Sequence, residues 1–205
     1  MKIGRLVGIV VLYFAISVSI ASAKGTSPLD ASKFLHTLAN YALSILRSDK
    51  LTLEERENKV RTLLADNFDL PKIGRFVLGK TWRRASDAQK KEYQLLFGQF
   101  VTQVYAKRLG GYSGESFKII KADAYGKKDV LVITEISRPA GPSLKAGWRV
   151  RNGSKGLKIL DVLVEGISMA ATQRSEFQSV VQNHGLGRLL EMLRLRVNKY
   201  AARGS

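Results

Sequence analysis

The sequence predicts an α+β fold, in which an antiparallel sheet is packed between helices from the two ends of the chain. Apolar residues recur at helical spacing between residues 30 and 109, and again after residue 172. Between these stretches lie four short runs rich in apolar, β-branched and aromatic residues. Strands that are grouped together, rather than alternating with helices, are typical of α+β proteins. The 205 residues suffice for one domain and a small extension.

Four helices are expected in the first half of the chain. Helical periodicity extends over residues 30–47, and Thr52 with Glu55 forms a capping box that opens a second helix, through about Asn67. Pro71 suits the first turn of a short third helix, and Gly79 suits its end. Ser86 and Gln89 form another capping box, and the helix that follows stops at residues 110–111. Its wide apolar face includes Phe97, Phe100, Val101 and Val104.

The strands are expected at residues 117–124, 130–136, 146–151 and 157–164. Residues 126–128 form a turn between the first two, and residues 152–156 close a hairpin between the last two. Two helices, about residues 172–184 and 186–198, end the chain on either side of Gly185.

The last predicted strand, residues 157–164, is apolar on both faces apart from Lys158 and Asp161. A strand of an antiparallel sheet usually turns one polar face to water. Something must therefore cover the second face, either other parts of the protein or a molecule that it carries.

The first 23 residues have the pattern of a cleaved signal peptide. Lys2 and Arg5 precede an uncharged apolar run over residues 6–20, and Ala21 and Ala23 suit a signal peptidase. The alternative is an uncleaved membrane anchor, because about 18 uncharged residues nearly span a bilayer. In either case the domain that follows is expected outside the cytoplasm.

The charge favours anionic partners. The leader holds two of the 34 Lys and Arg residues and none of the 17 Asp and Glu residues, so its removal leaves a net charge of +15. Such an excess attracts anionic lipid, acidic protein surfaces or nucleic acid, and export argues against nucleic acid. The chain has no cysteine, which excludes disulfides, thiolate chemistry and Cys-ligated metals.

Little in the sequence points to catalysis. His36 and His184 lie outside any metal-spaced cluster, and Ser168 lacks the second glycine of a nucleophile elbow. Asp161 and Glu165 would lie about 13 Å apart on an extended strand, too far for a glycosidase pair. We expect these carboxylates to anchor a loop amide or an arginine such as Arg174, because a charge near a core needs a partner.

Three blocks carry a resemblance to a known family: FDLPKIGRFVLGKTWRRAS, QKKEYQLLFGQFVTQVYAKRL and ILDVLVEGISMAATQRSEFQSVVQNHGLGRLLEML. With the strands between them, they resemble the MlaC family of periplasmic phospholipid-binding proteins, also called the toluene-tolerance auxiliary family, over about residues 31–197. The hopanoid-associated HpnM proteins are the branch suggested. Trp148 and Leu157 stand where the family often has tyrosine and tryptophan, which puts the shape of the pocket in doubt.

The resemblance implies a twisted cystatin-like or NTF2-like sheet and a deep apolar cavity for acyl chains between the sheet and its helices. It also implies a shuttle that moves lipid between an inner-membrane ABC transporter with a lipid-binding ring and an outer-membrane lipoprotein–porin complex. No cofactor or metal is implied, since phospholipid or a hopanoid-type lipid would be cargo.

Two sets of residues are candidates for these roles. The candidate lipid-binding residues are Phe76, Trp82, Phe97, Phe100, Val101, Val104, Leu131, Ile133, Trp148, Val150, Val162, Val164 and Met169. The candidate residues for contact with a lipid head group or a docking partner are Lys72, Arg75, Lys80, Arg83 and Arg84. For each residue taken singly, core packing or a solvated surface is the competing interpretation.

Two other functions remain open at this point. An enzyme on the same scaffold could use Asp161 or Glu165 as a general base on an apolar substrate. A membrane-tethered adaptor would retain the leader, whereas a processed chain would begin at Lys24.

Overall fold

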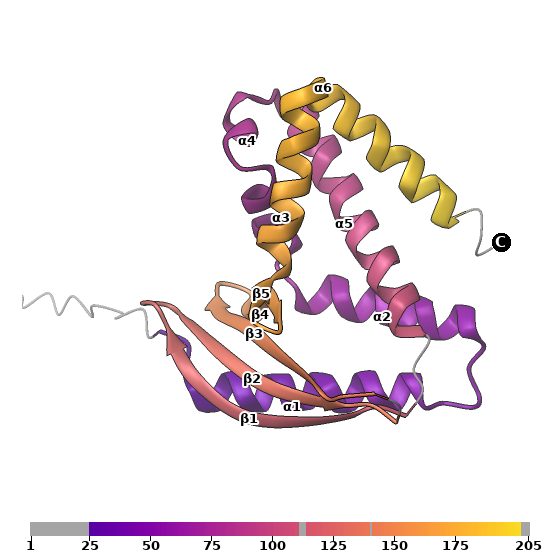
Figure 1. Ribbon diagram of the computed structural model, residues 1–205, viewed down its shortest axis with the longest axis vertical. Coiled ribbons are helices and arrows are strands. Elements are labelled where there is room, and N and C mark those ends of the chain that lie inside the picture. Colours follow the sequence, from indigo (N-terminus) through magenta and orange to yellow (C-terminus); the bar gives the residue numbers. More distant parts are fainter. Residues whose placement is uncertain (1–24, 111–113, 140, 202–205) are drawn as a thin grey trace, which may run out of the picture.

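The computed structural model describes residues 25–110, 114–139 and 141–201. The predicted signal peptide, residues 1–23, lies outside the described residues. In chain order the elements are α1 (Pro28–Leu46), α2 (Leu53–Asn67), α3 (Leu70–Leu78), α4 (Lys80–Arg84), α5 (Asp87–Gly110), β1 (Ser116–Tyr125), β2 (Asp129–Ser137), β3 (Leu144–Gly153), β4 (Gly156–Val164), β5 (Ile167–Ser168) and α6 (Met169–Ala201). Figure 1 shows the helices α3, α5 and α6 grouped above the sheet, and α1 running alongside the strands.

The sheet is a continuous antiparallel meander. Its strands follow the order β1-β2-β3-β4-β5, so each strand pairs with its neighbour in sequence. The four predicted strands are confirmed, each within two residues at either end. Bulges at Ile119/Lys121 and at Arg149/Val150 bend the sheet and increase its twist.

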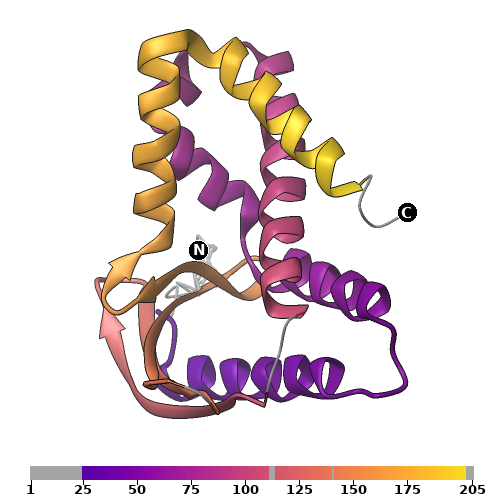
Figure 2. The ribbon, with the colours of Figure 1, turned by 45° about the vertical axis from the view of Figure 1, so that its right-hand side comes forward.

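The helix boundaries follow the predicted caps. Thr52 and Glu55 form the predicted capping box at the start of α2, and Ser86 and Gln89 exchange the same pair of hydrogen bonds before α5. Gly185 interrupts α6 with φ 80° and ψ 169°, a conformation reserved in practice for glycine. Figure 2 shows the second half of α6 descending from this kink beside α5.

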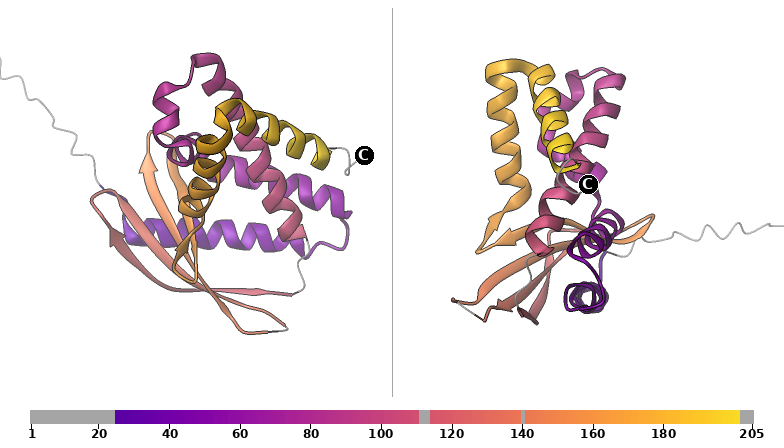
Figure 3. Two further views of the ribbon diagram at one scale, coloured as in Figure 1. Left: turned by 45° about the horizontal axis from the view of Figure 1, so that its top comes forward. Right: turned by 90° about the vertical axis from the view of Figure 1, so that its right-hand side faces the viewer.

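One face of the sheet packs against α1 and forms the first core. Figure 3 shows α1 end-on, with the strands on one side of it. The buried residues of this core are Ala31, Leu35, Val130, Val132, Val150 and Ile159. The Trp148 indole N–H donates to the buried Thr134 hydroxyl at 2.9 Å, and this hydroxyl donates to the Ala146 carbonyl at 3.1 Å, so both side chains are paired.

The helices α3, α5 and α6 form a second core around aromatic rings. Tyr93 stacks on Phe97 with ring centroids 5.6 Å apart, and Phe177 meets both rings edge-on. The Tyr93 hydroxyl donates to the Gly74 carbonyl at 3.1 Å, and burial raises the pKa of Tyr93, so this hydroxyl stays protonated. A Cβ on Gly74 would lie 2.9 Å from the Phe97 ring, so glycine permits α3 to approach α5 this closely.

Two junctions connect the helical half to the sheet. At the α2–α3 junction, Phe68 bridges to Ile159, and the Asp69 amide donates to the Ile159 carbonyl at 3.0 Å. The other junction is the passage from β4 through β5 into α6. Among the described residues, no helix combines the length and hydropathy needed to cross a bilayer.

Candidate functional site

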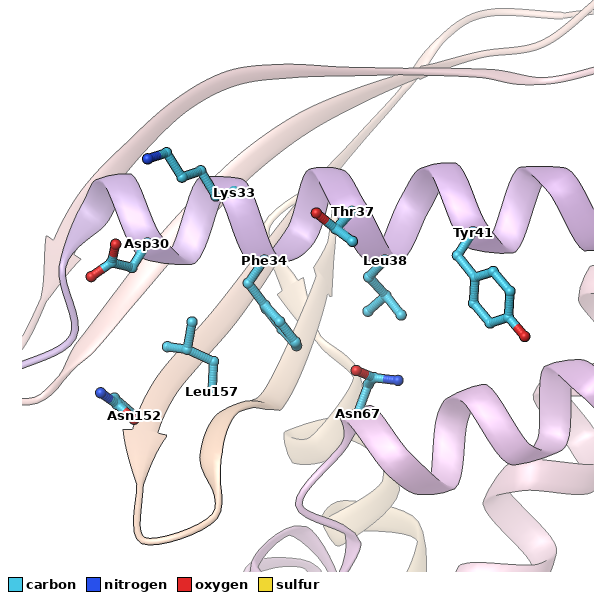
Figure 4. A pocket seen from close by; sticks show the side chains of 9 residues that line it. All are labelled: Asp30, Lys33, Phe34, Thr37, Leu38, Tyr41, Asn67, Asn152 and Leu157. Atoms are coloured by element: carbon cyan, nitrogen blue, oxygen red, sulfur yellow. The ribbon is translucent and has the colours of Figure 1, made fainter.

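A groove of about 560 Å³ runs between α1, the end of α2 and the β3–β4 hairpin. Its volume lies within the range of small-molecule sites, about 300 to 1,000 Å³. Figure 4 shows Phe34, Leu38 and Tyr41 on the side of α1 that faces α2 and the hairpin. The complete lining is Asp30, Lys33, Phe34, Thr37, Leu38, Tyr41, Asn67, Asn152 and Leu157.

The groove exists because α1 carries two apolar stripes. Ala31, Leu35 and Ile45 are buried against the rest of the protein. Phe34, Leu38 and Tyr41 recur at i, i+4 and i+7 and form a neighbouring stripe on the same helix. The described parts of the chain leave this second stripe partly uncovered, and Tyr41 is 56% exposed. An apolar stripe rimmed by polar residues is the feature that an apolar ligand needs.

The polar groups of the groove lie at its rim. Asp30, Lys33 and Thr37 are exposed residues on α1, and Asn152 is exposed at the end of β3. Asn67 is held in place because its side-chain amide donates to the Leu63 carbonyl at 2.8 Å. The apolar residues of the groove pack against the α1 core, since Phe34, Leu38 and Leu157 all contact that cluster.

The structure divides the thirteen candidate lipid-binding residues among several places. Phe97 and Phe100 are buried in the core of the helical half, where Trp82, Val101 and Val104 pack against them. Trp148, Val150 and Val162 belong to the core beneath α1, next to the groove. Phe76 is 42% exposed on α3, under the Arg174 guanidinium at 5.0 Å from the ring centroid. Val164 at the end of β4 and Met169 at the start of α6 are half-buried.

Leu131 and Ile133 occupy the opposite face of the sheet. The strand register places Ile133 beside Gly147, and Gly147 beside Leu163. A Cβ on Gly147 would lie 3.2 Å from Leu131 and 3.3 Å from Ile133, so these side chains fill the space above the glycine. The apolar second face of the last long strand therefore meets neighbouring side chains at Leu163, which is half-buried, and the first face packs on the α1 core.

None of the thirteen candidates lines the groove itself. Three of them, Trp148, Val150 and Val162, share a core with the groove lining, and the others lie elsewhere. Phe34, Leu38 and Tyr41 lie within the helical periodicity predicted for residues 30–47, which does not distinguish a groove from a core contact. The signal that could have identified them is the width of the apolar face, which exceeds what one packing contact covers.

The carboxylates near the end of β4 hold backbone together. Asp161 accepts hydrogen bonds from the Ser168 hydroxyl at 2.6 Å and from the Ala170 amide at 3.1 Å, which fixes the first turn of α6. Glu165 accepts from the Lys145 amide at 2.7 Å. The anchoring role predicted for Asp161 and Glu165 is confirmed, with backbone amides and the Ser168 hydroxyl, rather than Arg174, as their hydrogen-bond partners.

The two histidines lie on the surface. His36 is exposed on α1 within 3.3 Å of the Asn40 side chain, and His184 is exposed next to the kink of α6. Within residues 25–110, 114–139 and 141–201, no three His, Asp or Glu side chains form a group that could hold a metal ion.

The candidate basic cluster extends along α3 and α4. Lys72 pairs with Asp69 at 2.5 Å in the first turn of α3. Arg75, Lys80, Arg83 and Arg84 are exposed. The cluster begins near the sheet, where Lys72 lies beside Gly153, and continues along α3 and α4. A helix rises about 1.5 Å per residue, so later members lie farther from Lys72. None of its members lines the groove.

Both the sequence and the fold of this chain match known proteins. A family model described as MlaC protein matches residues 36–195. The intermembrane phospholipid transport system binding protein MlaC of Haemophilus influenzae is 21% identical over 188 residues, which cover 88% of this chain and 88% of the relative. A phospholipid-binding protein from Ralstonia solanacearum, solved in complex with a phospholipid, matches with a TM-score of 0.72 at 21% identity, over 83% of this chain and 98% of that chain.

The solved structure confirms the predicted α+β fold with its antiparallel sheet. The family match spans α1 from His36 through most of α6, so it includes most of both cores and most of the groove lining. The chain belongs to the MlaC protein family.

Proposed function

We propose that this protein is a periplasmic carrier that holds the acyl chains of a phospholipid, or of a hopanoid-type lipid, in the groove beside α1. The observation that carries the proposal is a partly uncovered apolar stripe, Phe34, Leu38 and Tyr41, in a chain of the MlaC family. The relative from Haemophilus influenzae, named for intermembrane phospholipid transport, supports the same substrate class. The predicted signal peptide supports the location.

Trp148, Val150 and Val162 would form the floor of the site as the groove deepens around cargo. They belong to the same core as Phe34 and Leu38, so movement of α1 away from the sheet would add their surface to the groove. Met169 and the aliphatic candidate residues outside this core could also change their packing during such a movement.

The energetics suit a carrier rather than a permanent binding protein. At ~0.8 kcal/mol per buried CH₂, two long acyl chains gain on the order of 20 kcal/mol against water. That value is close to the limit of non-covalent affinity. A bilayer offers the chains a similar environment, so the net preference for the protein is small and its partners can set the direction of transfer.

The proposed partners are the lipid-binding ring of an inner-membrane ABC transporter and an outer-membrane lipoprotein–porin complex. The exposed cluster Arg75, Lys80, Arg83 and Arg84 is the proposed docking surface for an acidic face of either partner. Arginine and aromatic residues are enriched at protein–protein interfaces, and Phe76 lies exposed beside this cluster. Its position away from the groove favours protein docking over contact with a lipid head group.

A substitution that fills the groove tests the carrier function. Thr37 is exposed and lines the groove, so Thr37→Trp places an indole in the space proposed for an acyl chain. We expect at least tenfold slower transfer of a fluorescent phospholipid between vesicles, with an unchanged melting temperature. Asn40→Trp, also exposed on α1 but outside the groove, is the matched control and should leave transfer unchanged. Equal transfer by both variants would place the cargo elsewhere.

A further inference from the structure

Four exposed lysines gather at one end of the sheet. Lys127 and Lys128 lie in the β1–β2 turn, Lys155 lies in the β3–β4 turn, and Lys33 lies on α1. The strand register pairs Asp129 with Tyr125 on one side and with Arg151 on the other, which puts both turns at the same end. We call these four residues the lysine tip.

The segment that leads into α1 connects the two turns. The Thr26 hydroxyl donates to the Lys128 carbonyl at 2.7 Å and accepts from the Asn152 amide at 2.8 Å. The start of α1, the β1–β2 turn and the β3–β4 hairpin therefore form one surface. This arrangement is specified by the fold and does not depend on the lysine side chains.

The charges of the lysine tip are available to a partner. Within the described parts of the chain, no ion pair reaches the ammonium groups of Lys33, Lys127, Lys128 or Lys155. Asp30, on the first turn of α1, lowers the net positive charge of this end of the molecule by one. Two large apolar side chains lie at the same end, since Leu29 is 61% exposed and Tyr125 is 45% exposed.

The lysine tip also borders the groove. Lys33 and Asp30 line the groove from α1, and Asn152 lines it from the hairpin. Figure 4 shows Asp30 and Asn152 together at one end of the groove. A flat surface held against this end would therefore lie next to the site proposed for acyl chains.

We infer that the lysine tip contacts an anionic phospholipid bilayer directly. Lysine is a compact, strongly hydrated point charge and is depleted from protein–protein interfaces, whereas each lysine near an anionic membrane surface strengthens binding. Leu29 beside the charges suits insertion at the head-group boundary, and Tyr125 suits the membrane interface. The cluster on α3 and α4 is richer in arginine, with Arg75, Arg83 and Arg84, so the two surfaces suit two kinds of partner.

Such contact would let cargo pass between the groove and the bilayer without a protein acceptor. The lysines of the two turns would contact the lipid head groups, and the groove would lie next to the membrane surface. Binding would weaken as salt rises, because exposed charges are screened over about 10 Å at ordinary ionic strength.

The test is co-sedimentation with vesicles of phosphatidylcholine, with and without phosphatidylglycerol, using purified protein whose N-terminus has been defined by intact mass. We expect the wild-type chain to bind only the anionic vesicles. Replacing Lys127, Lys128 and Lys155 with glutamine should lower the partition coefficient about fivefold per lysine, about a hundredfold in all.

The matched control removes the same charge elsewhere, with Arg75, Arg83 and Arg84 replaced by glutamine. It should keep vesicle binding within about threefold of wild type, because its charges lie on the other surface. Equal loss in both variants would show that net charge alone drives binding and would overturn the inference. Binding of wild type to both kinds of vesicle, or to neither, would also overturn it. Since the readout is adsorption rather than lipid uptake, the outcome is independent of the cargo proposal.

Discussion

Asp161 shows how a single buried carboxylate fixes the path of the chain. It is 8% exposed and accepts hydrogen bonds from Ser168 and from the Ala170 amide, where β4 gives way to α6. Asp161→Ala leaves both donors without this acceptor, and we expect a loss of about 3 kcal/mol in the free energy of unfolding, measured by urea denaturation. Asp161→Asn keeps one acceptor oxygen and should recover part of that loss.

The control for Asp161 is Asp123→Ala, which removes an exposed carboxylate paired with Lys121. Exposed ion pairs contribute little, so the change should stay below about 0.5 kcal/mol. If Asp161→Ala were equally mild, the anchoring role would be wrong. The interpretation of Asp161 as a general base would then regain support.

Individual residues also explain why the site was harder to predict than the fold. Phe97 and Phe34 both lie on amphipathic helices, and periodicity marks both as apolar. Phe97 is 1% exposed among aromatic rings, whereas Phe34 faces a groove. The difference depends on which element lies opposite, and that is a property of packing between distant segments rather than of local sequence.

At the scale of elements, the kink in α6 is set by one glycine. Gly185→Ala should cost about 1 to 3 kcal/mol, because its φ of 80° is strained for a residue with a Cβ. Gly187→Ala is the matched control and should stabilise by up to about 1 kcal/mol, since alanine favours the helix. A Cβ at either position meets nothing within 4 Å, so neither substitution creates a steric clash that would contribute to the measured difference.

Urea denaturation of the Gly185 and Gly187 variants decides the point. Opposite signs would show that the bend is a fixed feature of the fold. If both substitutions stabilised the protein, α6 would also populate a straight form, because alanine disfavours the positive φ that the bend requires.

The capping box of α2 predicts a pH dependence. The Glu55 carboxylate accepts from the Thr52 amide at 2.8 Å, and this hydrogen bond lowers the pKa of Glu55 below its ordinary value of 4.5. Because the pKa is lower in the folded state, the stabilisation is complete above that ordinary value and is lost as pH falls through the folded-state pKa.

The variant that tests this is Glu55→Gln, compared with wild type in thermal melts at about pH 7 and about pH 3. It should lower the melting temperature at the higher pH and converge with wild type at the lower pH. Glu54→Gln, in the same turn but without hydrogen bonds to Thr52, should show a smaller difference at the higher pH. A difference for Glu55→Gln that persists at the lower pH would contradict the assignment.

Elements with a strong local signal were predicted well, and short ones were missed. The two capping boxes and the strand-ending turns fix boundaries within a few residues, because local hydrogen bonds determine them. The two-residue strand β5 and the five-residue helix α4 are too short to show any period. β5 forms because Leu163 and Val164 offer a free strand edge after the turn at residues 165–166.

At the scale of the whole molecule, the two halves serve different parts of the proposed cycle. The sheet and α1 provide the groove and the lysine tip. The helical half provides the arginine-rich surface on α3 and α4. The two halves join at Phe68, at the start of α6, and in a further core where Ile45 and Leu46 of α1 pack against α2 and α5.

The central claim is that the groove beside α1 carries lipid, and native mass spectrometry tests it most directly. The protein would be purified from a bacterial periplasm without detergent, weighed intact and then extracted with solvent. We predict a mass excess of one or two lipid molecules, with a phospholipid or hopanoid-type lipid recovered in the extract. A mass equal to the bare chain, with no lipid taken up from liposomes, would contradict the account.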